Sequence, residues 1–289
     1  MVTYNKNNLE LVEFNRDDIL GLIELSASVE WDYDEFEIRT VLSSGKIFGH
    51  KDAEGTIVSS AAIIKYDTYL ASIGMVIVHK EHRGLGLGKD ATQKCLDGVA
   101  GDFATMLIAT KEGAPLYEKM GFKTVDYIKK YLAENYIVKS RLTTKDMNFE
   151  NFNKSDFNEL VALDEAAFGD KRRNFLQNRV KQAKQCLVVK NHHANIIGFG
   201  ISILGSVNLI FGPIVAPDAK TAALILNNLA LNHQGKLRID VPAHNDEFIA
   251  LLEQSGFKEA SNPPVMIINS IEMPPRNKML FAIAAQIFG

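Results

Sequence analysis

The sequence contains few of the residues that stabilise extracellular domains or build membrane segments. Cysteine occurs only at Cys95 and Cys186, and their separation fits neither a metal-ligand motif nor a disulfide framework. No apolar run approaches the ~18 residues that a membrane helix needs, and residues 1–10 contain no apolar signal core. These absences predict a protein of the reducing cytoplasm, without a metal site and without a membrane contact.

An excess of positive charge is also missing. The chain has 32 Lys and Arg residues against 35 Asp and Glu residues, which gives a net charge of −3. Without a general basic patch, a nucleic-acid partner is not expected. The hydrophobic fraction of 46% is typical of a globular protein, and 289 residues are enough for two domains of ordinary size.

The most informative segment is residues 73–92. Its first part is a short apolar, β-branched run that predicts a buried strand, and apolar residues at four-residue spacing from Leu87 onward predict a helix. Between them, Gly84, Gly86 and Gly88 occupy alternate positions. Glycines at a helix start let unpaired backbone N–H groups approach an anion. The segment therefore predicts a phosphate-binding loop, although a glycine-rich turn that only caps a helix has the same pattern.

Neither of two common phosphate-binding motifs fits this loop. A Walker loop would need glycine at position 83 and Ser or Thr at position 90, and a Rossmann fingerprint would need glycine at position 89. The pattern Arg-x-x-Gly-x-Gly from Arg83 to Gly88, preceded by Val78, instead resembles the pyrophosphate loop of the GNAT superfamily, the acyl-coenzyme-A-dependent N-acetyltransferases. The usual pattern of that family has proline where this chain has Lys80.

A second segment, residues 109–122, resembles the second GNAT signature, which ends Leu-Tyr-Glu-Lys-x-Gly-Phe. Gly121 is placed to end a short helix, and Phe122 to begin the next strand. Many family members have asparagine seven residues before the tyrosine, where this chain has Thr110. A tyrosine before Gly-Phe is by itself more typical of a packed aromatic residue. The two signatures in this order and at this separation strengthen the resemblance.

The resemblance implies a fold and a set of ligand contacts. We expect an α/β (α+β) fold in which a mixed, mostly antiparallel sheet is flanked by helices. In this family the central strand splays from its neighbour, the pantetheine of acetyl-coenzyme A pairs with the free edge, and a backbone N–H there polarises the thioester carbonyl. The implied cofactor contacts are Val76, Ile77, Val78, Arg83, Gly84, Leu85, Gly86, Leu87, Gly88, Lys89 and Thr110. The implied acid that protonates the leaving thiolate is Tyr117.

The implied acceptor is an amine, which must lose a proton before it attacks because an alkylammonium has a pKa of about 10. The acidic segment 30–37 is either a solvated helix start or a rim of the acceptor site that attracts this cation. The expected substrate residues are Glu30, Trp31, Asp32 and Tyr33. The general base stays unassigned among Glu30, Asp32, Asp34 and Glu35. His79 and His82 lie on a turn, where we expect solvated side chains.

The second half of the sequence repeats the first. Residues 251–258 resemble residues 116–123, and residues 212–217 resemble the end of the central strand, at nearly the same separation in both copies. We predict a GNAT domain that binds acetyl-coenzyme A at 1–140. A degenerate GNAT-like domain without a cofactor loop is predicted at 150–289, where Leu252 stands in place of Tyr117. Apolar residues at 280–287 have helical spacing and are predicted to dock on the second domain, with a dimer contact as the alternative.

Together these patterns predict an acetyl-coenzyme-A-dependent N-acetyltransferase that acts on a primary amine of a small molecule, as a monomer or a homodimer. Two alternatives stay open. A protein or peptide N-acetyltransferase would need an open groove, whereas a second domain leaning over the first would enclose the site. A regulatory module that binds acyl-coenzyme A without turnover would share the loop, and only a turnover measurement separates it from an enzyme.

Overall fold

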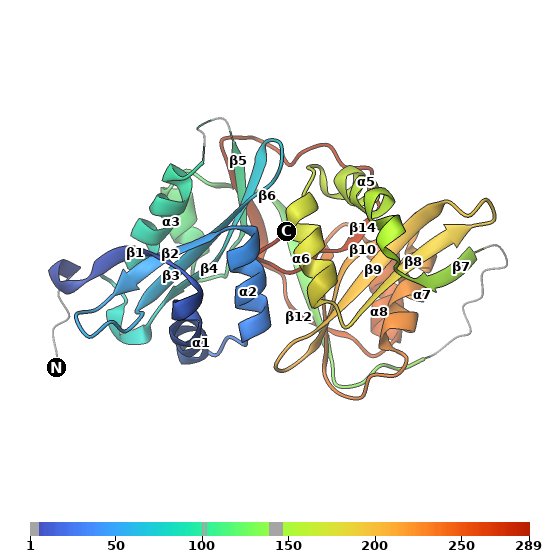
Figure 1. Cartoon of the computed structure of the whole chain (residues 1–289), viewed down its shortest axis with the longest axis horizontal. Helices are drawn as coiled ribbons and strands as arrows, with labels where there is room; N and C mark the ends of the chain where they lie inside the picture. The colour runs from blue at the N-terminus through green and yellow to red at the C-terminus, as the bar shows by residue number, and fades with distance from the viewer. Residues whose placement is uncertain (1–5, 100, 102, 139–146) are drawn as a thin grey trace.

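The computed structural model describes residues 6–99, 101, 103–138 and 147–289. The predicted domain boundary at 140–150 falls largely on residues outside this set, as does the first half of the N-terminal stretch 1–10. The described strands form one hydrogen-bonded sheet that runs through two lobes lying side by side (Figure 1). Within this described part, no helix combines the length and the hydropathy that a membrane crossing requires.

The first lobe alternates strands and helices in the predicted order. Its elements are β1 (Glu10–Phe14), α1 (Ile19–Ser28), α2 (Glu35–Ser44), β2 (Lys46–Lys51), β3 (Ser59–Lys65), β4 (Leu70–Val78), α3 (Leu87–Asp97), β5 (Ala104–Ile108), α4 (Ala114–Lys119) and β6 (Lys123–Ala133). Successive residues of β3 face opposite sides of the sheet: Ala62 and Ile64 pack with α1 and α2, whereas Ala61 and Ile63 pack with α3. The lobe is therefore a sheet with helices on both faces.

The second lobe repeats this order. Its elements are β7 (Met147–Asn151), α5 (Phe157–Phe168), α6 (Arg173–Gln182), β8 (Gln185–Asn191), β9 (Ile196–Leu204), β10 (Leu209–Val215), α7 (Ala219–Ala230), β11 (Leu237–Pro242), α8 (Asp246–Gln254), β12 (Lys258–Ser261), β13 (Pro264–Ile268) and β14 (Leu280–Ala282). Among the described strands, only the pairs β4–β5 and β10–β11 are parallel. The predicted mixed, mostly antiparallel sheet flanked by helices is confirmed.

The repeat extends to the turn that begins each lobe. In the first lobe, the Asn15 side chain accepts a hydrogen bond from the N–H of Asp17 at 2.8 Å, and the Asn15 N–H donates to Asp18 at 2.8 Å. In the second lobe, the Asn153 N–H donates to Asp156 in the same way, at 2.8 Å. This reciprocal cap satisfies N–H groups that the following helix cannot pair, so the same local chemistry starts both copies.

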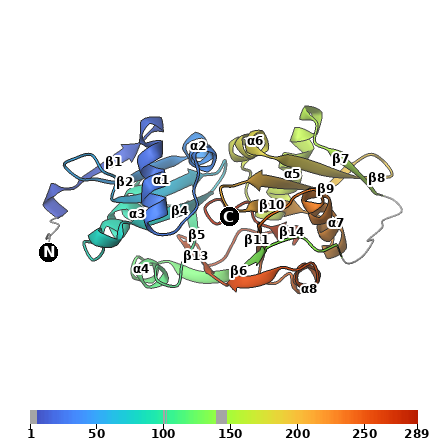
Figure 2. The same ribbon diagram turned by 90° about the horizontal axis from the view of Figure 1, so that it is seen from below.

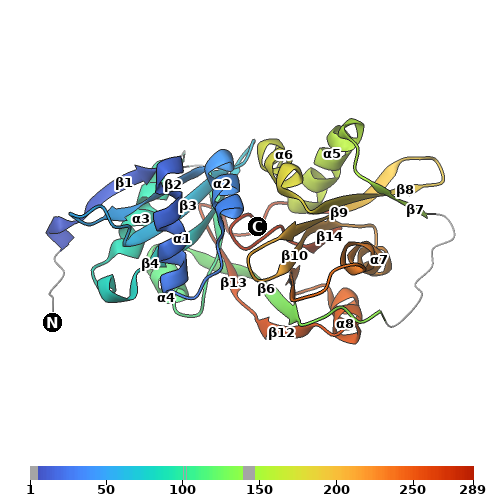
Figure 3. The same ribbon diagram turned by 60° about the horizontal axis from the view of Figure 1, so that its bottom comes forward.

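The two lobes exchange strands, as the view from below and the tilted view show (Figures 2 and 3). Strand β13, from the second half of the sequence, lies between β5 and β6 of the first half, with Ile267 opposite Met106 and Lys123. The far half of β6 pairs in turn with β11, where Ala133 lies opposite Leu237. Each lobe thus completes its sheet with a strand encoded by the other half, which ties the lobes together.

The chain's last described segment differs from the prediction. Residues 280–282 form strand β14 on β10, with Ala282 opposite Ile214, and residues 283–289 continue as turns rather than a helix. They cross to the first lobe, where Ser72 Oγ donates to the Ile287 carbonyl at 2.8 Å. The helix prediction is wrong because the apolar spacing reflects burial against both lobes, and the backbone hydrogen bonds go to a strand and to side chains.

Two buried arginines hold this crossing segment. Arg172 pairs with Asp164 at 2.6 Å, both side chains fully buried, and also donates to the Phe288 carbonyl at 2.9 Å. Arg179 donates to the Ala284 carbonyl at 2.7 Å. A buried charge needs such partners because its desolvation is costly. The segment is therefore fixed in the interface between the lobes.

Candidate active site

The glycine loop between β4 and α3 has the backbone geometry of an anion cradle. Gly84 and Gly86 have φ values of +84° and +80°, a region that residues with a Cβ rarely adopt. A Cβ built on either glycine would meet no atom within 4 Å, so the space above the loop is open. Gly88 differs: it is buried under the start of α3, and a Cβ there would lie 3.4 Å from a methyl carbon of Val78, at ordinary van der Waals contact.

The backbone N–H groups of residues 84–89 make no hydrogen bond within the part of the chain that the structure describes. They surround the N-terminus of α3, where the helix macrodipole favours negative charge. Arg83 and Lys89 are exposed beside them and add positive charge. Leu85 is half-buried and Leu87 is buried at 1% exposure, so these two residues can reach a ligand through their backbone. The loop can hold a pyrophosphate.

The central strand β4 has a free edge beyond the loop. It pairs with β5 only at residues 70–73, opposite residues 104–107, and the other edge of β5 pairs with β13. A bulge at Met75, with φ +53°, separates this paired part from Val76, Ile77 and Val78. Ser60 Oγ donates to the Met75 carbonyl at 2.8 Å and supports the bulge. No described strand pairs with β4 on the β5 side after residue 73, so an extended ligand arm could pair there.

Tyr117 lies in the helical layer beside this strand. Its side chain is 6% exposed and packs with Cys95 of α3 and with Phe122, whose ring centroid is 5.9 Å away. Burial raises the pKa of the Tyr117 hydroxyl, with a smaller contribution from Cys95. The phenol is therefore neutral, and able to donate a proton, at physiological pH. Thr110 is exposed, and its Oγ1 accepts a hydrogen bond from the Gly113 N–H at 3.0 Å.

His82 is buried rather than solvated, so that expectation is wrong. Its side chain is 4% exposed because a short 3-10 turn, residues 80–82, folds the ring inward to within 5.7 Å of the His79 ring. Burial lowers the pKa of His82, and the neighbouring His79 lowers it further. His79 is half-buried, and its Nδ1 accepts from the Glu81 N–H at 3.4 Å.

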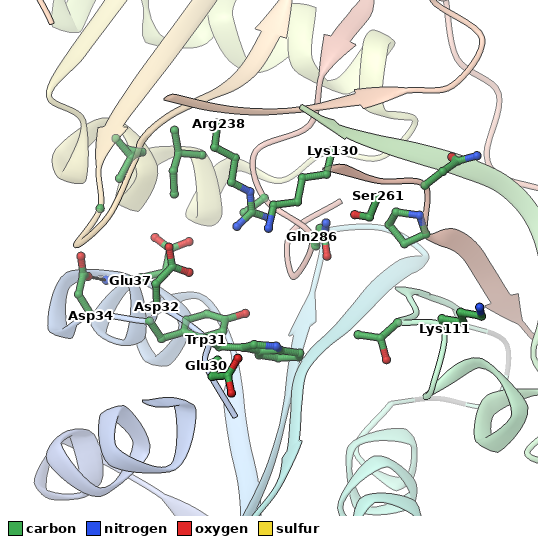
Figure 4. A pocket seen from close by; sticks show the side chains of 18 of the residues that line it. Glu30, Trp31, Asp32, Asp34, Glu37, Lys111, Lys130, Arg238, Ser261 and Gln286 are labelled. Carbon is green, nitrogen blue, oxygen red and sulfur yellow. Dashed lines mark hydrogen bonds between the residues drawn. The ribbon is translucent and has the colours of Figure 1, made fainter. Parts of the chain in front are cut away.

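A cleft of about 710 Å³ lies between the two lobes. Figure 4 shows the acidic segment between α1 and α2 on one side and side chains of β6 and β11 on the other. The structure brings all four predicted substrate residues, Glu30, Trp31, Asp32 and Tyr33, to this cleft, together with Thr110 of the β5–α4 loop. The remaining predicted cofactor residues and Tyr117 do not line it.

The acidic side of the cleft is only partly available to a ligand. Asp34 caps α2 by accepting from the Glu37 N–H at 2.8 Å. Glu37 pairs with Arg179 at 2.7 Å. Burial raises the pKa of both Asp34 and the Tyr33 hydroxyl. Asp32, which is exposed, makes no side-chain hydrogen bond or ion pair with any described residue.

The opposite side carries cations that sequence reasoning missed. Lys130 of β6 and Arg238 of β11 point into the cleft (Figure 4). Arg238 pairs with Asp240 at 2.8 Å. Burial lowers the pKa of Lys130, and Arg238 lowers it further. The two cations meet because β6 continues to Ala133 and pairs there with β11.

The second lobe presents a different surface at the equivalent place. Asp218 caps α7 by accepting from the Thr221 N–H at 2.7 Å, so the N-terminus of that helix already has an anion. Strand β10 pairs with β11 only at residues 209–211, and β14 occupies the edge beyond. The Ile283 N–H extends this contact to the Asp240 carbonyl of β11 at 2.9 Å. We call the unpaired strand edge beside residues 76–78 of β4 the slot of the first lobe. The equivalent slot beside β10 is filled by residues 280–283.

Sequence comparison shows that the chain is similar to known acetyltransferases along most of its length. Two sequence profiles, each described as an acetyltransferase (GNAT) domain, match residues 44–124 and residues 160–282. The chain is 36% identical over 282 residues to YitH, an uncharacterized N-acetyltransferase of Bacillus subtilis strain 168, with 97% of this chain and 98% of that protein covered. The chain therefore belongs to the GNAT family of acetyltransferases.

Solved structures share its fold. A candidate acetyltransferase from Pyrococcus horikoshii gives a TM-score of 0.80 at 18% identity, over 100% of this chain and 99% of that one. A GCN5-related N-acetyltransferase from Sphaerobacter thermophilus gives 0.64 at 14% identity, over 93% and 98%. A tandem GNAT protein from the clavulanic acid biosynthesis pathway gives 0.65 at 12% identity, over 90% and 98%. The tandem arrangement predicted from the internal repeat is confirmed.

Proposed function

We propose that the protein transfers an acetyl group from acetyl-coenzyme A to the primary amine of a small molecule. One observation carries this proposal: the glycine loop with unpaired N–H groups leads directly into the free edge of β4. Loop and edge together have the shape of a pyrophosphate followed by an extended arm. The second lobe lacks both features, so we propose one cofactor site in each chain.

The residues of the first lobe fit acetyl-coenzyme A. The N–H groups of residues 84–89 would hold the pyrophosphate, with Arg83 and Lys89 adding charge at the rim. The backbone of residues 76–78 would pair with the pantetheine, and an N–H there would stabilise negative charge on the carbonyl oxygen. When bound, the thioester supplies the activated acetyl group. Tyr117 would donate its proton to the departing thiolate.

The acceptor amine would enter through the cleft between the lobes. Asp32 is exposed at its acidic side and would attract an ammonium group. Ser206 of the second lobe donates to the Asp32 carbonyl at 2.9 Å, so the lobes touch beside the cleft. This contact favours a small acceptor over a protein segment, which would need an open groove. Both sides of the cleft come from one chain, so the proposal requires no second copy.

The test has two parts. Calorimetry should show tight binding of acetyl-coenzyme A to the full chain at a molar ratio near one. A thiol-release assay with a panel of amines, amino acids, aminoglycosides and peptides should then show turnover with a small amine. Absence of cofactor binding would overturn the proposal. Binding without turnover on any panel member would instead support a regulatory module, and preference for peptides would support the protein-acetyltransferase alternative.

A further inference from the structure

The cleft between the lobes carries charges of both signs, whereas a site for a simple cation needs only the negative ones. Asp32 lies on the acidic side, and Lys130 and Arg238 lie on the other (Figure 4). No ion pair joins Asp32 to either cation in the described structure. Opposite charges that face one another without pairing leave a place for a ligand that carries both signs.

The basic side is built by paired strands. Lys130 on β6 lies directly opposite Asp240 on β11, and Arg238 lies two residues before Asp240 on the same strand, so all three side chains share one face. Asp240 is already satisfied: Arg238 binds its Oδ2 through Nε at 3.0 Å, and the amide of Gln286 donates to Oδ1 at 3.4 Å. Asp240 attracts Lys130 electrostatically, but its oxygens are bonded to Arg238 and Gln286 and form no ion pair with Lys130.

Lys130 consequently presents an unpaired, half-buried ammonium group to the cleft. It makes no hydrogen bond or ion pair with any described residue. Nη1 of Arg238 likewise has no partner within the described chain, because the bonds to Asp240 use Nε and Nη2. Holding cations partly out of water is costly unless an anion meets them. Two such donors side by side suit the two oxygens of a carboxylate.

We infer that the acceptor is amino-acid-like: it carries a carboxylate, bound by Lys130 and Arg238, in addition to the amine that Asp32 attracts. This inference rests on the proposed function and narrows it from amines in general to zwitterions. The acidic residues on one side and the cations on the other would orient the molecule across the cleft. The alternative is that Asp32 and the two cations only attract each other across solvent and bind no ligand.

Matched pairs of acceptors test the inference. L-Phenylalanine is compared with phenylalaninamide and phenethylamine, and L-lysine with cadaverine, in a thiol-release assay at saturating acetyl-coenzyme A. We expect the carboxylated member of the preferred pair to have a KM lower by roughly 10- to 100-fold, the scale of hydrogen bonds to charged groups. Equal or better kcat/KM for the members without a carboxylate overturns the inference, as does failure of every carboxylated member to bind or react.

Two variants test whether Lys130 causes the lower KM of the carboxylated acceptor. Lys130→Gln should remove the advantage of the carboxylated member and leave the KM of its amide unchanged. Lys129→Gln is the matched control, because Lys129 is adjacent on β6, faces the other way and pairs with Glu259 at 3.8 Å. An equal response of both variants, or none from Lys130→Gln, overturns the assignment. Calorimetry with acetyl-coenzyme A on each variant keeps failure of the proposed function separate, since these residues lie outside the cofactor loop.

Discussion

The two lobes share one order of strands and helices, yet they differ at the two places where a coenzyme would bind. In the first lobe, α3 begins with glycines and unpaired N–H groups, and β4 has a free edge. In the second lobe, Asp218 caps α7 and β14 covers the edge of β10. Both lobes therefore have the same framework, whereas the glycine loop and the unpaired edge of β4 in the first lobe are what would provide a cofactor site.

The second lobe nevertheless contributes to the proposed site. Arg238 comes from its strand β11, and Lys130 comes from the part of β6 that pairs with β11. The segment held in the filled slot continues to Gln286, which also lines the cleft. The second lobe, for which we propose no cofactor site, would thus supply part of the surface that receives the acceptor. The following predictions test this division of roles.

The largest expected effect is at the loop. Gly86→Val should abolish measurable binding of acetyl-coenzyme A, because a branched side chain would occupy the open space and φ of +80° would no longer be accessible. Gly101→Val is the control, since a Cβ there meets no described atom within 4 Å and Gly101 lies outside the loop. Wild-type affinity by calorimetry in a folded Gly86→Val protein would show that the loop does not bind the cofactor.

Tyr117→Phe removes the hydroxyl and keeps the ring. This change should lower kcat by roughly 10- to 10⁴-fold, the range of general acid catalysis, and leave the affinity for acetyl-coenzyme A nearly unchanged. Because burial raises the pKa of Tyr117, the acid form persists above the usual tyrosine pKa of about 10. The wild-type kcat should therefore show no loss from tyrosine ionisation as pH rises toward that value. Tyr127→Phe, at an exposed position, is the control. An unchanged kcat under chemistry-limited conditions makes Tyr117 a packing residue only.

Substitutions in the acidic segment 30–37 should have a smaller effect on KM, and the structure reduces the residues worth testing to one. Asp34 caps α2, and the other three acidic side chains of the segment pair with cations: Glu30 with Lys80 at 3.4 Å, Glu35 with Arg39 at 2.6 Å and Glu37 with Arg179 at 2.7 Å. Asp32, which makes no ion pair with a described residue, is therefore the one expected to attract an ammonium. Asp32→Asn should raise KM for cationic acceptors by about 2- to 5-fold, the scale of an exposed ion pair. Added salt should reduce this difference. Glu35→Gln should change nothing. A KM insensitive to salt and to Asp32→Asn would return the segment to a solvated helix start.

The smallest effect concerns the second lobe and appears in stability alone. Asp218→Ala removes the cap of α7 and should lower the free energy of unfolding by about 0.5–2 kcal/mol. It should not create a second cofactor site, because β14 still fills the slot. Thermal unfolding measures the first outcome, and titration with acetyl-coenzyme A measures the second. A molar ratio of two, in this variant or in the wild type, would mean that the second lobe is not degenerate.

The features that could be predicted from the sequence are those that depend on residues close together in the chain. The spacing of Arg83, Gly86 and Gly88 predicted the loop, and the acidic segment, for which a rim of the acceptor site was one of two interpretations, lines the cleft between the lobes. It missed Lys130 and Arg238 because their proximity depends on pairing between β6 and β11, whose partners are far apart in the chain. It misread residues 280–287 because apolar spacing cannot distinguish a helix from a segment buried on all sides.

The strand exchange has a consequence for how the chain is made. A ribosome delivers the first lobe almost entirely before it reaches residue 264, yet β13 must lie between β5 and β6 in the finished molecule. Until then the edge of β5, with Met106 and Leu107, lacks its native neighbour and resembles the unpaired edges that attract other chains. A nascent chain stopped before residue 264 leaves both lobes incomplete, since β5 and β6 would lack β13 in the first lobe and β10 would lack β14 in the second. Synthesis of residues 264–282 is therefore the event that lets both lobes reach their final strand order.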